Sequence, residues 1–420
     1  MSSPPSGSAR GILRFGVIIG IGIIAAGLGV AVVDLVRPTG FGASRLLVRN
    51  TLHFQASVQI FSGAVALILS VLWHAVSTER DYFRRLRPLV ILCLAMCAVS
   101  AALIFGVNWL LVTERSPDYL ALVPVVSMLL TAGIYVVIIH PLSGSTEVGI
   151  AARLALRSSY RWLLIAAVLH FTWVAARVFE HTGLLWFIER PVIEVALLGF
   201  VLLGSLGLLL AGLPAVSANR NLVRSMIKAH QATNTVILGW GIMQAWVIRF
   251  PGSYQAFVLS LLGIGLLICC ITLASNSSLL TRRSFSGAWR TEEALASIAF
   301  IFMTVATALL AVTAIVAAGT GQMPLQMLFV GVLLCLGSGV TGFSAASIVV
   351  SLRGWAGFLM GGGALLLVIG TLAAVALVSI TDLVWRSLDL HLAGAQGLMA
   401  AGLILILLSV LFYKTPQDQP

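Results

Sequence analysis

The ionisable residues inside, or at the ends of, long apolar runs of this sequence include His53, His170, Arg177, Glu194 and His391. An imidazole ligates metals and relays protons near neutral pH, and ionisable groups inside a membrane are costly and mark proton or solute paths. His170 and Arg177 are seven residues apart, about two helical turns, so they share roughly one helix face. With Glu194 they predict a path for protons or a solute. Hydrogen bonding between packed helices, worth about 1 kcal/mol per contact, is the alternative.

The composition of the chain indicates which elements position these residues. The chain has 420 residues, of which 60% are hydrophobic and 9% charged, and its mean hydropathy is +1.06. Soluble domains are about half apolar and about a quarter charged, so we expect an integral membrane protein. Apolar runs of about 20 residues or more suit helices that cross a hydrocarbon core about 30 Å thick. The expected fold class is therefore all-α, because strands of a membrane barrel read as alternating segments of about ten residues.

The apolar runs predict a polytopic protein with about twelve transmembrane helices. The expected spans are 12–36, 51–77, 87–112, 118–140, 161–180, 191–213, 225–249, 254–276, 292–318, 324–350, 355–381 and 390–413. Residues 1–10, rich in Ser, Pro and Gly, and residues 415–420 are expected to be disordered tails. The linkers between the spans are too short to hold a soluble domain.

One apolar segment recurs three times along the chain. Its copies end at Leu72–Ser77, Gly212–Ser217 and Gly342–Ser347, with spacings of 140 and 130 residues. Recurrence at about thirds of the chain indicates three related units. The predicted units, each of four helices, are 11–150, 151–285 and 286–414. Because four is even, the units run in the same direction, which implies a pseudo-threefold arrangement about the membrane normal. Chance likeness among apolar helices rich in small residues is the alternative.

The distribution of basic residues predicts the orientation. Of the 25 Lys and Arg residues, 17 lie in the two termini and in the loops after even-numbered spans. Cytoplasmic loops carry the excess of positive charge, so both termini are expected in the cytoplasm, in a bacterial cytoplasmic (inner) membrane. The net charge of +11 then reflects topology and attraction to anionic lipid headgroups, and nucleic-acid binding is not expected.

The helix plan and a few residues resemble a known superfamily. The run Phe41–Arg49 precedes His53 at the start of span two, and span six carries Glu194–Phe200 and then Leu213–Pro214. With twelve helices in three four-helix arcs, the chain resembles subunit I of the haem-copper oxidases and the related NnrS-like membrane proteins. In the oxidases, span two opens with a histidine that ligates the low-spin haem, and His53 is similar in position. Where NnrS-like proteins carry a histidine in span six, this chain has Glu194.

The resemblance implies a b-type haem near the outer face. His53 and His391 are the candidate axial ligands, and Arg386 is the candidate partner of a haem propionate. Residues at the membrane interface without a cofactor are the alternative. The resemblance further implies a membrane subunit of a respiratory or nitric-oxide-related complex, embedded in the lipid bilayer, with other membrane subunits or a c-type cytochrome as partners.

Oxygen reduction is not expected, because the residues of a copper site are missing. The oxidase site needs histidines on spans six, seven and ten, and spans six and ten have none; span seven has only His230, near its cytoplasmic end. Pro324 and Gln326 stand where ligands are expected in span ten. Copper requires several converging imidazoles. The sequence also carries no P-loop, metalloprotease or hydrolase motif, and Cys93 and Cys97 are expected to be packing residues rather than metal ligands. Neither a catalytic residue nor a metal site is predicted.

Three classes of function therefore stay open. The first is a non-oxidase haem protein of the superfamily above. The second is a proton-coupled secondary transporter that uses Glu194, His170 and Arg177. The third is a cofactor-free structural subunit of a larger membrane complex. A haem absorption band, pH-dependent solute uptake and isolation only within a larger complex distinguish the three.

Overall fold

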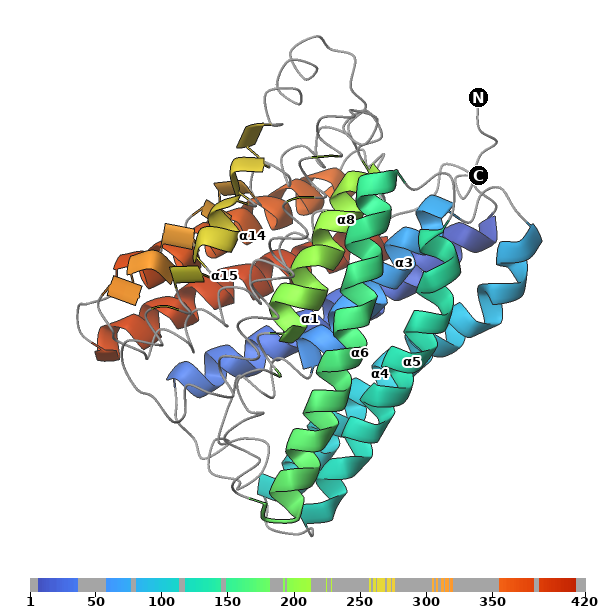
Figure 1. Ribbon diagram of the computed structural model, residues 1–420, viewed down its shortest axis with the longest axis horizontal. Helices are drawn as coiled ribbons and strands as arrows, with labels where there is room; N and C mark the ends of the chain where they lie inside the picture. The colour runs from blue at the N-terminus through green and yellow to red at the C-terminus, as the bar shows by residue number, and fades with distance from the viewer. Residues whose placement is uncertain are drawn as a thin grey trace.

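A computed structural model gives the fold of the chain. It describes residues 7–36, 58–76, 81–112, 118–144, 149–181, 192, 195–212, 224, 228, 355–380 and 385–412, together with parts of 257–275 and 304–319. Throughout this described part the elements are helices and the turns that follow them, which confirms the all-α prediction. Figure 1 shows these helices coloured along the chain.

The described elements fall into a series from the N-terminal half and a pair near the C-terminus. The first series comprises α1 Gly7–Val36, η1 Gln59–Ala64, α3 Val65–Val76, α4 Asp81–Val112, η2 Asp118–Ala121, α5 Leu122–Ser143, α6 Ile150–Val178, η3 Val195–Leu202 and α8 Leu203–Gly212. The pair comprises α14 Trp355–Ile380 and α15 Trp385–Phe412. The segments η1 and η3 are π-helical and continue directly into α3 and α8, whereas η2 is a short 3-10 helix before α5.

Five helices in the described part are long and apolar enough to cross a membrane. Their apolar stretches are Gly11–Val30, Arg85–Val107, Tyr119–Ser143, Ile150–Val178 and Ala393–Leu411. These helices make the chain an integral membrane protein, as its composition predicts. Most of the predicted spans seven to ten lies outside the described residues. The count of twelve and the division into units 11–150, 151–285 and 286–414 therefore stay predictions.

The fifth span begins earlier than the sequence predicts. The expected limits were 161–180, whereas α6 runs over Ile150–Val178. The prediction excluded the first turns because Arg153 and Arg157 interrupt the apolar run. A long basic side chain can lay its methylene stem along a helix and keep its charged end at the membrane interface. The arginines therefore interrupt the apolar run without ending the helix.

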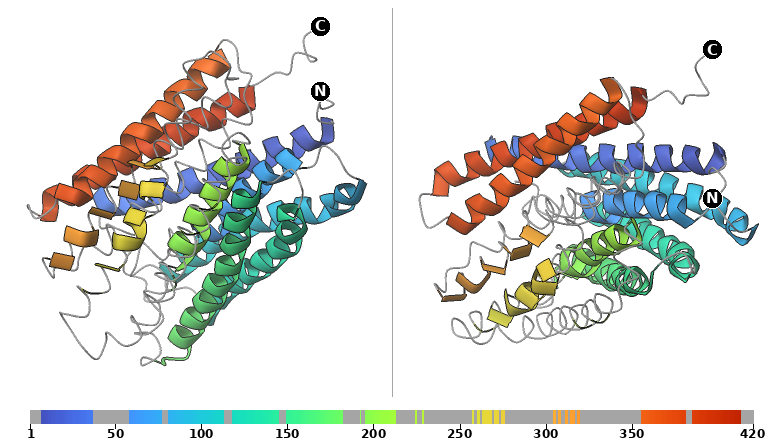
Figure 2. Two further views of the ribbon diagram at one scale, coloured as in Figure 1. Left: turned by 45° about the horizontal axis from the view of Figure 1, so that its top comes forward. Right: turned by 90° about the horizontal axis from the view of Figure 1, so that it is seen from above.

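The two ends of the described chain pack against each other. Helix α1 lies against α15, and α15 in turn packs along α14, as two directions of view show (Figure 2). The guanidinium of Arg14 donates a hydrogen bond to the carbonyl of Val410 at 3.3 Å. On its other side α1 packs against η1 and α3, while α4, α5 and α6 pack in chain order. Helix α1 therefore connects the C-terminal pair to the rest of the bundle.

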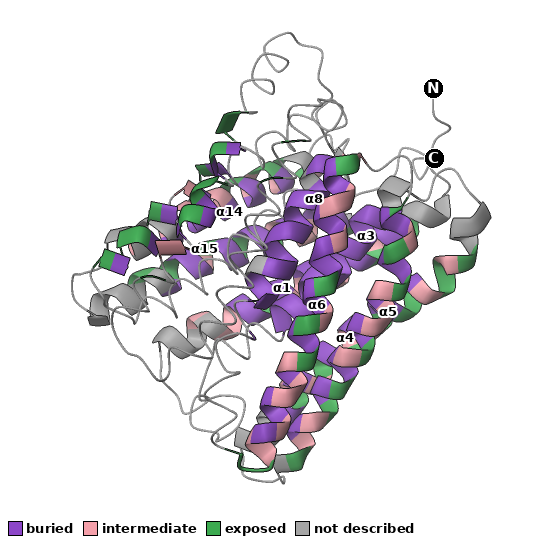
Figure 3. Cartoon of the chain, viewed as in Figure 1, coloured by how far each residue is buried: buried purple, intermediate pink, exposed green. Residues whose placement is uncertain are grey.

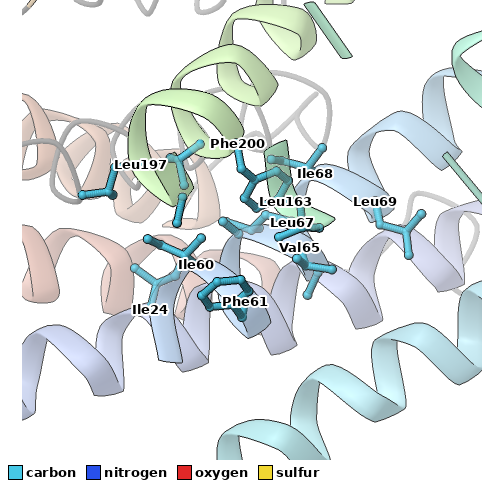
Figure 4. Close-up of a cluster of buried hydrophobic side chains, with 14 of the residues drawn as sticks. Ile24, Ile60, Phe61, Val65, Leu67, Ile68, Leu69, Leu163, Leu197 and Phe200 are labelled. Atoms are coloured by element: carbon cyan, nitrogen blue, oxygen red, sulfur yellow. The ribbon is translucent and has the colours of Figure 1, made fainter. Parts of the chain in front are cut away.

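The π-helical segment η1 and the helix α3 occupy the centre of the described bundle. Every residue from 58 to 73 is buried. In Figure 3, where buried residues are purple, this colour marks α3. Side chains of η1 and α3 gather with Leu163 of α6 and with Leu197 and Phe200 of η3 (Figure 4). Since the element has no face toward lipid, its polar residues Gln59 and Ser62 are enclosed by protein.

Close helix contacts depend on glycine at defined positions. A Cβ atom at Gly402 of α15 would lie 2.6 Å from the carbonyl oxygen of Gly363 on α14, and one at Gly363 would lie 2.6 Å from the carbonyl of Gly402. On α1, a Cβ at Gly20 would meet Leu67 of α3 at 2.6 Å. Small residues that let backbones approach are typical of helix pairs in membranes, where packing replaces the hydrophobic effect as the driving force.

The reciprocal contact of Gly363 and Gly402 predicts the effect of a single methyl group. Gly402→Ala should lower the free energy of unfolding by about 1–3 kcal/mol, because the obstructing atoms are backbone and cannot rotate away. Gly397→Ala on the same helix is the matched control, since a Cβ there meets nothing within 4 Å. Thermal unfolding of the purified protein in detergent measures both. Equal midpoints for the two variants would show that α14 and α15 are not in this contact.

Helix α6 ends in a Schellman turn that contains a strained residue. The amide of His181 donates to the carbonyl of Ala176 at 2.8 Å, and the amide of Glu180 donates to the carbonyl of Arg177 at 3.3 Å. This pair of bonds requires a left-handed residue at the helix end. Glu180 fills that position with φ 57°, where glycine is the usual residue because it has no Cβ.

Glu180→Gly should therefore stabilise the protein. Relief of the left-handed strain is expected to raise the free energy of unfolding by about 1 kcal/mol, net of the greater freedom that glycine has in the unfolded chain. Glu180→Ala removes the same carboxylate but keeps the Cβ, so it should give no such gain. A higher unfolding midpoint for Gly than for Ala supports the turn assignment, and the reverse order contradicts it.

Candidate proton or solute site

Four side chains form a continuous column between η1 and the end of α6. The imidazole of His170, 1% exposed, stacks on Phe61 with ring centroids 5.5 Å apart and an angle of 26° between the ring planes. It also stacks on Trp173, at 6.0 Å and 21°. The guanidinium carbon of Arg177 lies 5.5 Å from the centre of the Trp173 ring. The column thus runs from the buried centre to a half-buried cation near the helix end.

The helix periodicity explains how α6 presents this column. His170, Trp173 and Arg177 follow one another at intervals of three and four residues, which places successive side chains above one another on one face. A cation over an indole ring gains about 0.5–1 kcal/mol at exposed sites and about 2 kcal/mol when desolvated. Trp173 therefore holds the guanidinium of Arg177 against the same face that carries His170.

The level of His170 in the membrane follows from helix geometry. Seven residues separate it from Arg177, which corresponds to about 10 Å along the helix axis. Arg177 lies in the last turn of α6, where an arginine can reach the interface. His170 therefore lies about 10 Å further into the apolar stretch Ile150–Val178.

Two π-helical segments lie beside α6 or contact its column. Residues Gln59–Ala64 form η1 and residues Val195–Leu202 form η3, and η3 packs on both α6 and η1. π-Helical turns are rare and frequently occur at functional sites. The two segments also lie at corresponding places in the predicted units, because each leads into one of the recurring apolar segments that are 140 residues apart.

Several buried polar atoms near the centre have unused hydrogen-bonding capacity. Gln59 donates to the carbonyl of Ile24 at 3.5 Å, but its Oε1 atom has no hydrogen-bond partner in the described part of the chain. The same is true of the hydroxyls of Ser62 and Ser205. A buried polar group without a partner costs about 1–3 kcal/mol. Such groups within a bundle of membrane-spanning helices suit a path that binds a polar solute or water.

The structure brings together two of the three residues that the sequence predicts for this path. His170 and Arg177 share one face, as predicted, and Trp173 links them. Glu194 lies outside the described residues, while its neighbour Val195 is buried at the start of η3. The role of Phe61 was missed because it belongs to another element. Trp173 had a visible signal, an aromatic residue three positions after His170 on the same predicted span.

The predicted haem residues are not brought together by the described residues. His53 lies outside them, Arg386 is part of α15, and His391 is exposed on α15. The haem hypothesis, with His53, His391 and Arg386, therefore stays a prediction.

Comparisons with protein-family models, with curated proteins and with solved structures find no match to this chain.

Absorption spectroscopy tests the haem prediction directly. A b-type haem held by His53 would give the purified protein a Soret band, and His53→Ala should abolish or shift it because an axial ligand is lost. His391→Ala tests the second ligand in the same way. His140→Ala serves as the control, because that histidine lies at the end of α5 and is bonded to Tyr160. A colourless protein, or a band unchanged by His53→Ala, contradicts the assignment of His53.

Proposed function

We propose that this protein is a proton-coupled secondary transporter in which His170 and Arg177 form part of the path. The observation that carries the proposal is the imidazole of His170, which is 1% exposed within the apolar span Ile150–Val178 and stacks on Phe61 of η1 and on Trp173 of the same helix. Ionisable residues at such positions are rare and commonly mark proton relays or solute paths. Histidine suits the relay because its imidazole can both accept and donate a proton.

The column assigns a different task to each of its members. His170 exchanges the proton, since it is the buried group that can both accept and donate one. Its stacking on Phe61 and Trp173 restricts rotation of the ring and thereby fixes the direction of its two nitrogen atoms. Arg177 keeps a positive charge over Trp173 near the end of the span, which favours an anionic or zwitterionic solute at that end. Glu194 is the proposed third member.

The π-helical segments supply a way to couple the path to movement. A π-helical turn contains one residue more than the α-helical turn that could replace it, so the conversion rotates the side chains on one side of it. Phe61 belongs to η1 and stacks on His170. A change in η1 would therefore alter the environment of the imidazole. Transporters use interrupted helices near the membrane centre in a similar manner.

The proposal also includes a scaffold, a topology and a membrane for the protein. It comprises a haem-copper-oxidase-like or NnrS-like scaffold of about twelve spans, cytoplasmic termini and a bacterial inner membrane. The recurrence of a π-helical segment in predicted spans two and six supports related first and second units. A haem protein and a cofactor-free subunit, with membrane subunits or a c-type cytochrome as partners, are the functions that the experiments separate from transport.

Transport is tested in proteoliposomes loaded with a pH indicator. Under an inward proton gradient, a panel of small anionic and zwitterionic solutes should include at least one that moves protons together with itself. His170→Gln should slow that movement by about a hundredfold, the usual contribution of a positioned proton-transfer group. Arg177→Gln should raise the solute concentration needed for half-maximal rate, whereas Arg177→Lys keeps the charge over Trp173 and should act more weakly.

His140→Gln is the matched control for the transport experiment. It makes the same chemical change in a histidine that is exposed at the end of α5, outside the column. It should transport at the wild-type rate. Equal rates for wild type, His170→Gln and His140→Gln would exclude His170 from the path. Absence of solute-dependent proton movement across the panel, in a protein that is isolated only with partner subunits, favours the structural function.

A further inference from the structure

The end of the bundle where α5 meets α6 carries a basic cluster. Helix α5 ends at Ser143 and α6 begins at Ile150, so the two helices are antiparallel neighbours with these ends together. His140 lies in the last turn of α5, and its Nδ1 atom is 2.7 Å from the hydroxyl of Tyr160 on α6. This bond ties the two helices at the level where the basic residues of α6 begin.

Two arginines of α6 lie near this bond. Arg157 and Arg161 are four residues apart, one helical turn. Arg161 is exposed, and Arg157 is half-buried with its Nη2 atom 3.7 Å from the position that a Cβ of Gly144 would take. The Nε atom of Arg157 is buried and has no hydrogen-bond partner in the described part of the chain. The pair therefore presents guanidinium donors at the border between α5 and α6.

An exposed apolar surface continues from the arginines along both helices. On α6, Ile165 and Val168 are 44% and 52% exposed, and they follow Arg161 at intervals of four and seven residues. On α5, Val137 and Leu130 are 59% and 56% exposed. They precede His140 by three and ten residues, so they lie on the face that ends at this histidine. A basic end and an apolar stripe thus form one surface.

We propose that this surface, formed by His140, Arg157, Arg161 and the adjoining apolar residues, binds an anionic phospholipid. The phosphate lies between the guanidinium groups of Arg157 and Arg161, which donate charge-assisted hydrogen bonds to its oxygens. An acyl chain lies along Ile165 and Val168. The bond between His140 and Tyr160 holds α5 in place beside the headgroup and positions the site. This site is separate from the transport path. Arg157 lies near Gly144 at the end of α5, whereas His170 contacts Phe61 of η1.

The surface favours a lipid over other anionic ligands. A free phosphate would use the arginines but leave the apolar stripe without a function, and an acidic protein or nucleic acid would not reach the part of α6 that crosses the hydrocarbon. Zwitterionic phosphatidylcholine carries the same phosphate, but the positive charge of its choline group is repelled by the basic residues of this surface. Basic residues at the membrane surface are each worth about 1 kcal/mol toward anionic headgroups. The expected ligand is therefore a phosphatidylglycerol-like lipid.

Native mass spectrometry and thermal unfolding in detergent test the proposal. Phosphatidylglycerol should bind the wild-type protein and raise its unfolding midpoint, and phosphatidylcholine or inorganic phosphate should do neither. In the double variant Arg157→Gln/Arg161→Gln, the dissociation constant for phosphatidylglycerol should rise at least about tenfold, since hydrogen bonds to charged groups are lost. The midpoint of this variant in phosphatidylcholine should match wild type, which shows that it folds.

Arg85→Gln/Arg87→Gln is the charge-matched control. Both arginines are exposed on α4 at the same end of the bundle, because α4 and α5 are antiparallel neighbours. This variant should keep wild-type affinity for phosphatidylglycerol. If both double variants lose the same affinity for phosphatidylglycerol, the lipid is held only by the general positive charge of this end of the bundle, and the proposed site is wrong. A midpoint that rises equally with inorganic phosphate would also overturn it, in favour of a simple anion site.

Discussion

The structure depends on the complete enclosure of one helix by protein inside the membrane. Residues 58–73, which lead into and form η1 and most of α3, are buried throughout, so protein surrounds their backbone and their polar side chains. Membrane interiors tolerate irregular backbone only where protein or a cavity surrounds it. That is the situation of both π-helical segments. The enclosure thus permits a local geometry that a lipid-facing helix could not keep, and it places Phe61 against His170.

Glycines on the surrounding helices make this enclosure possible. Helix α1 approaches the central element at Gly20 and Gly27, where a Cβ would meet Leu67 and Gln59, and α8 approaches it at Gly204, where a Cβ would meet Ile68. Larger residues would hold the helices apart and open the centre to lipid. Packing at short range is the main source of helix association in a membrane. The buried amide of Gln59 is accommodated by the same device, because Gly27 leaves room for it beside the carbonyl of Ile24.

The features that depend on local chemistry could be predicted from the sequence. Long apolar runs predict membrane helices, and a seven-residue spacing places His170 and Arg177 on one face. Sequence reasoning could not predict contacts between distant segments, such as the packing of α1 against α15 or of Phe61 on His170, because periodicity carries no information about neighbours. It also placed the start of α6 at residue 161 instead of Ile150, since hydropathy treats an arginine as the end of a span. The π-helical geometry of η1 and η3 could not be predicted either, because no local sequence pattern in this chain indicates it.

The arginines at the two ends of α6 set the depth of the candidate path. Arg157 and Arg177 are twenty residues apart, about 30 Å along a helix, and the hydrocarbon core is about 30 Å thick. Moving α6 along its axis would draw one of these charges into the hydrocarbon, at a cost that rises to about 2.5–3.5 kcal/mol at the centre of the membrane. The helix is therefore held at one level, and His170 is held with it. The lipid phosphate proposed at Arg157 and the indole of Trp173 beside Arg177 each hold one of these arginines in place, and so help to fix the depth of α6 in the membrane. The surface toward lipid and the buried column thus belong to one helix, although they share no residue.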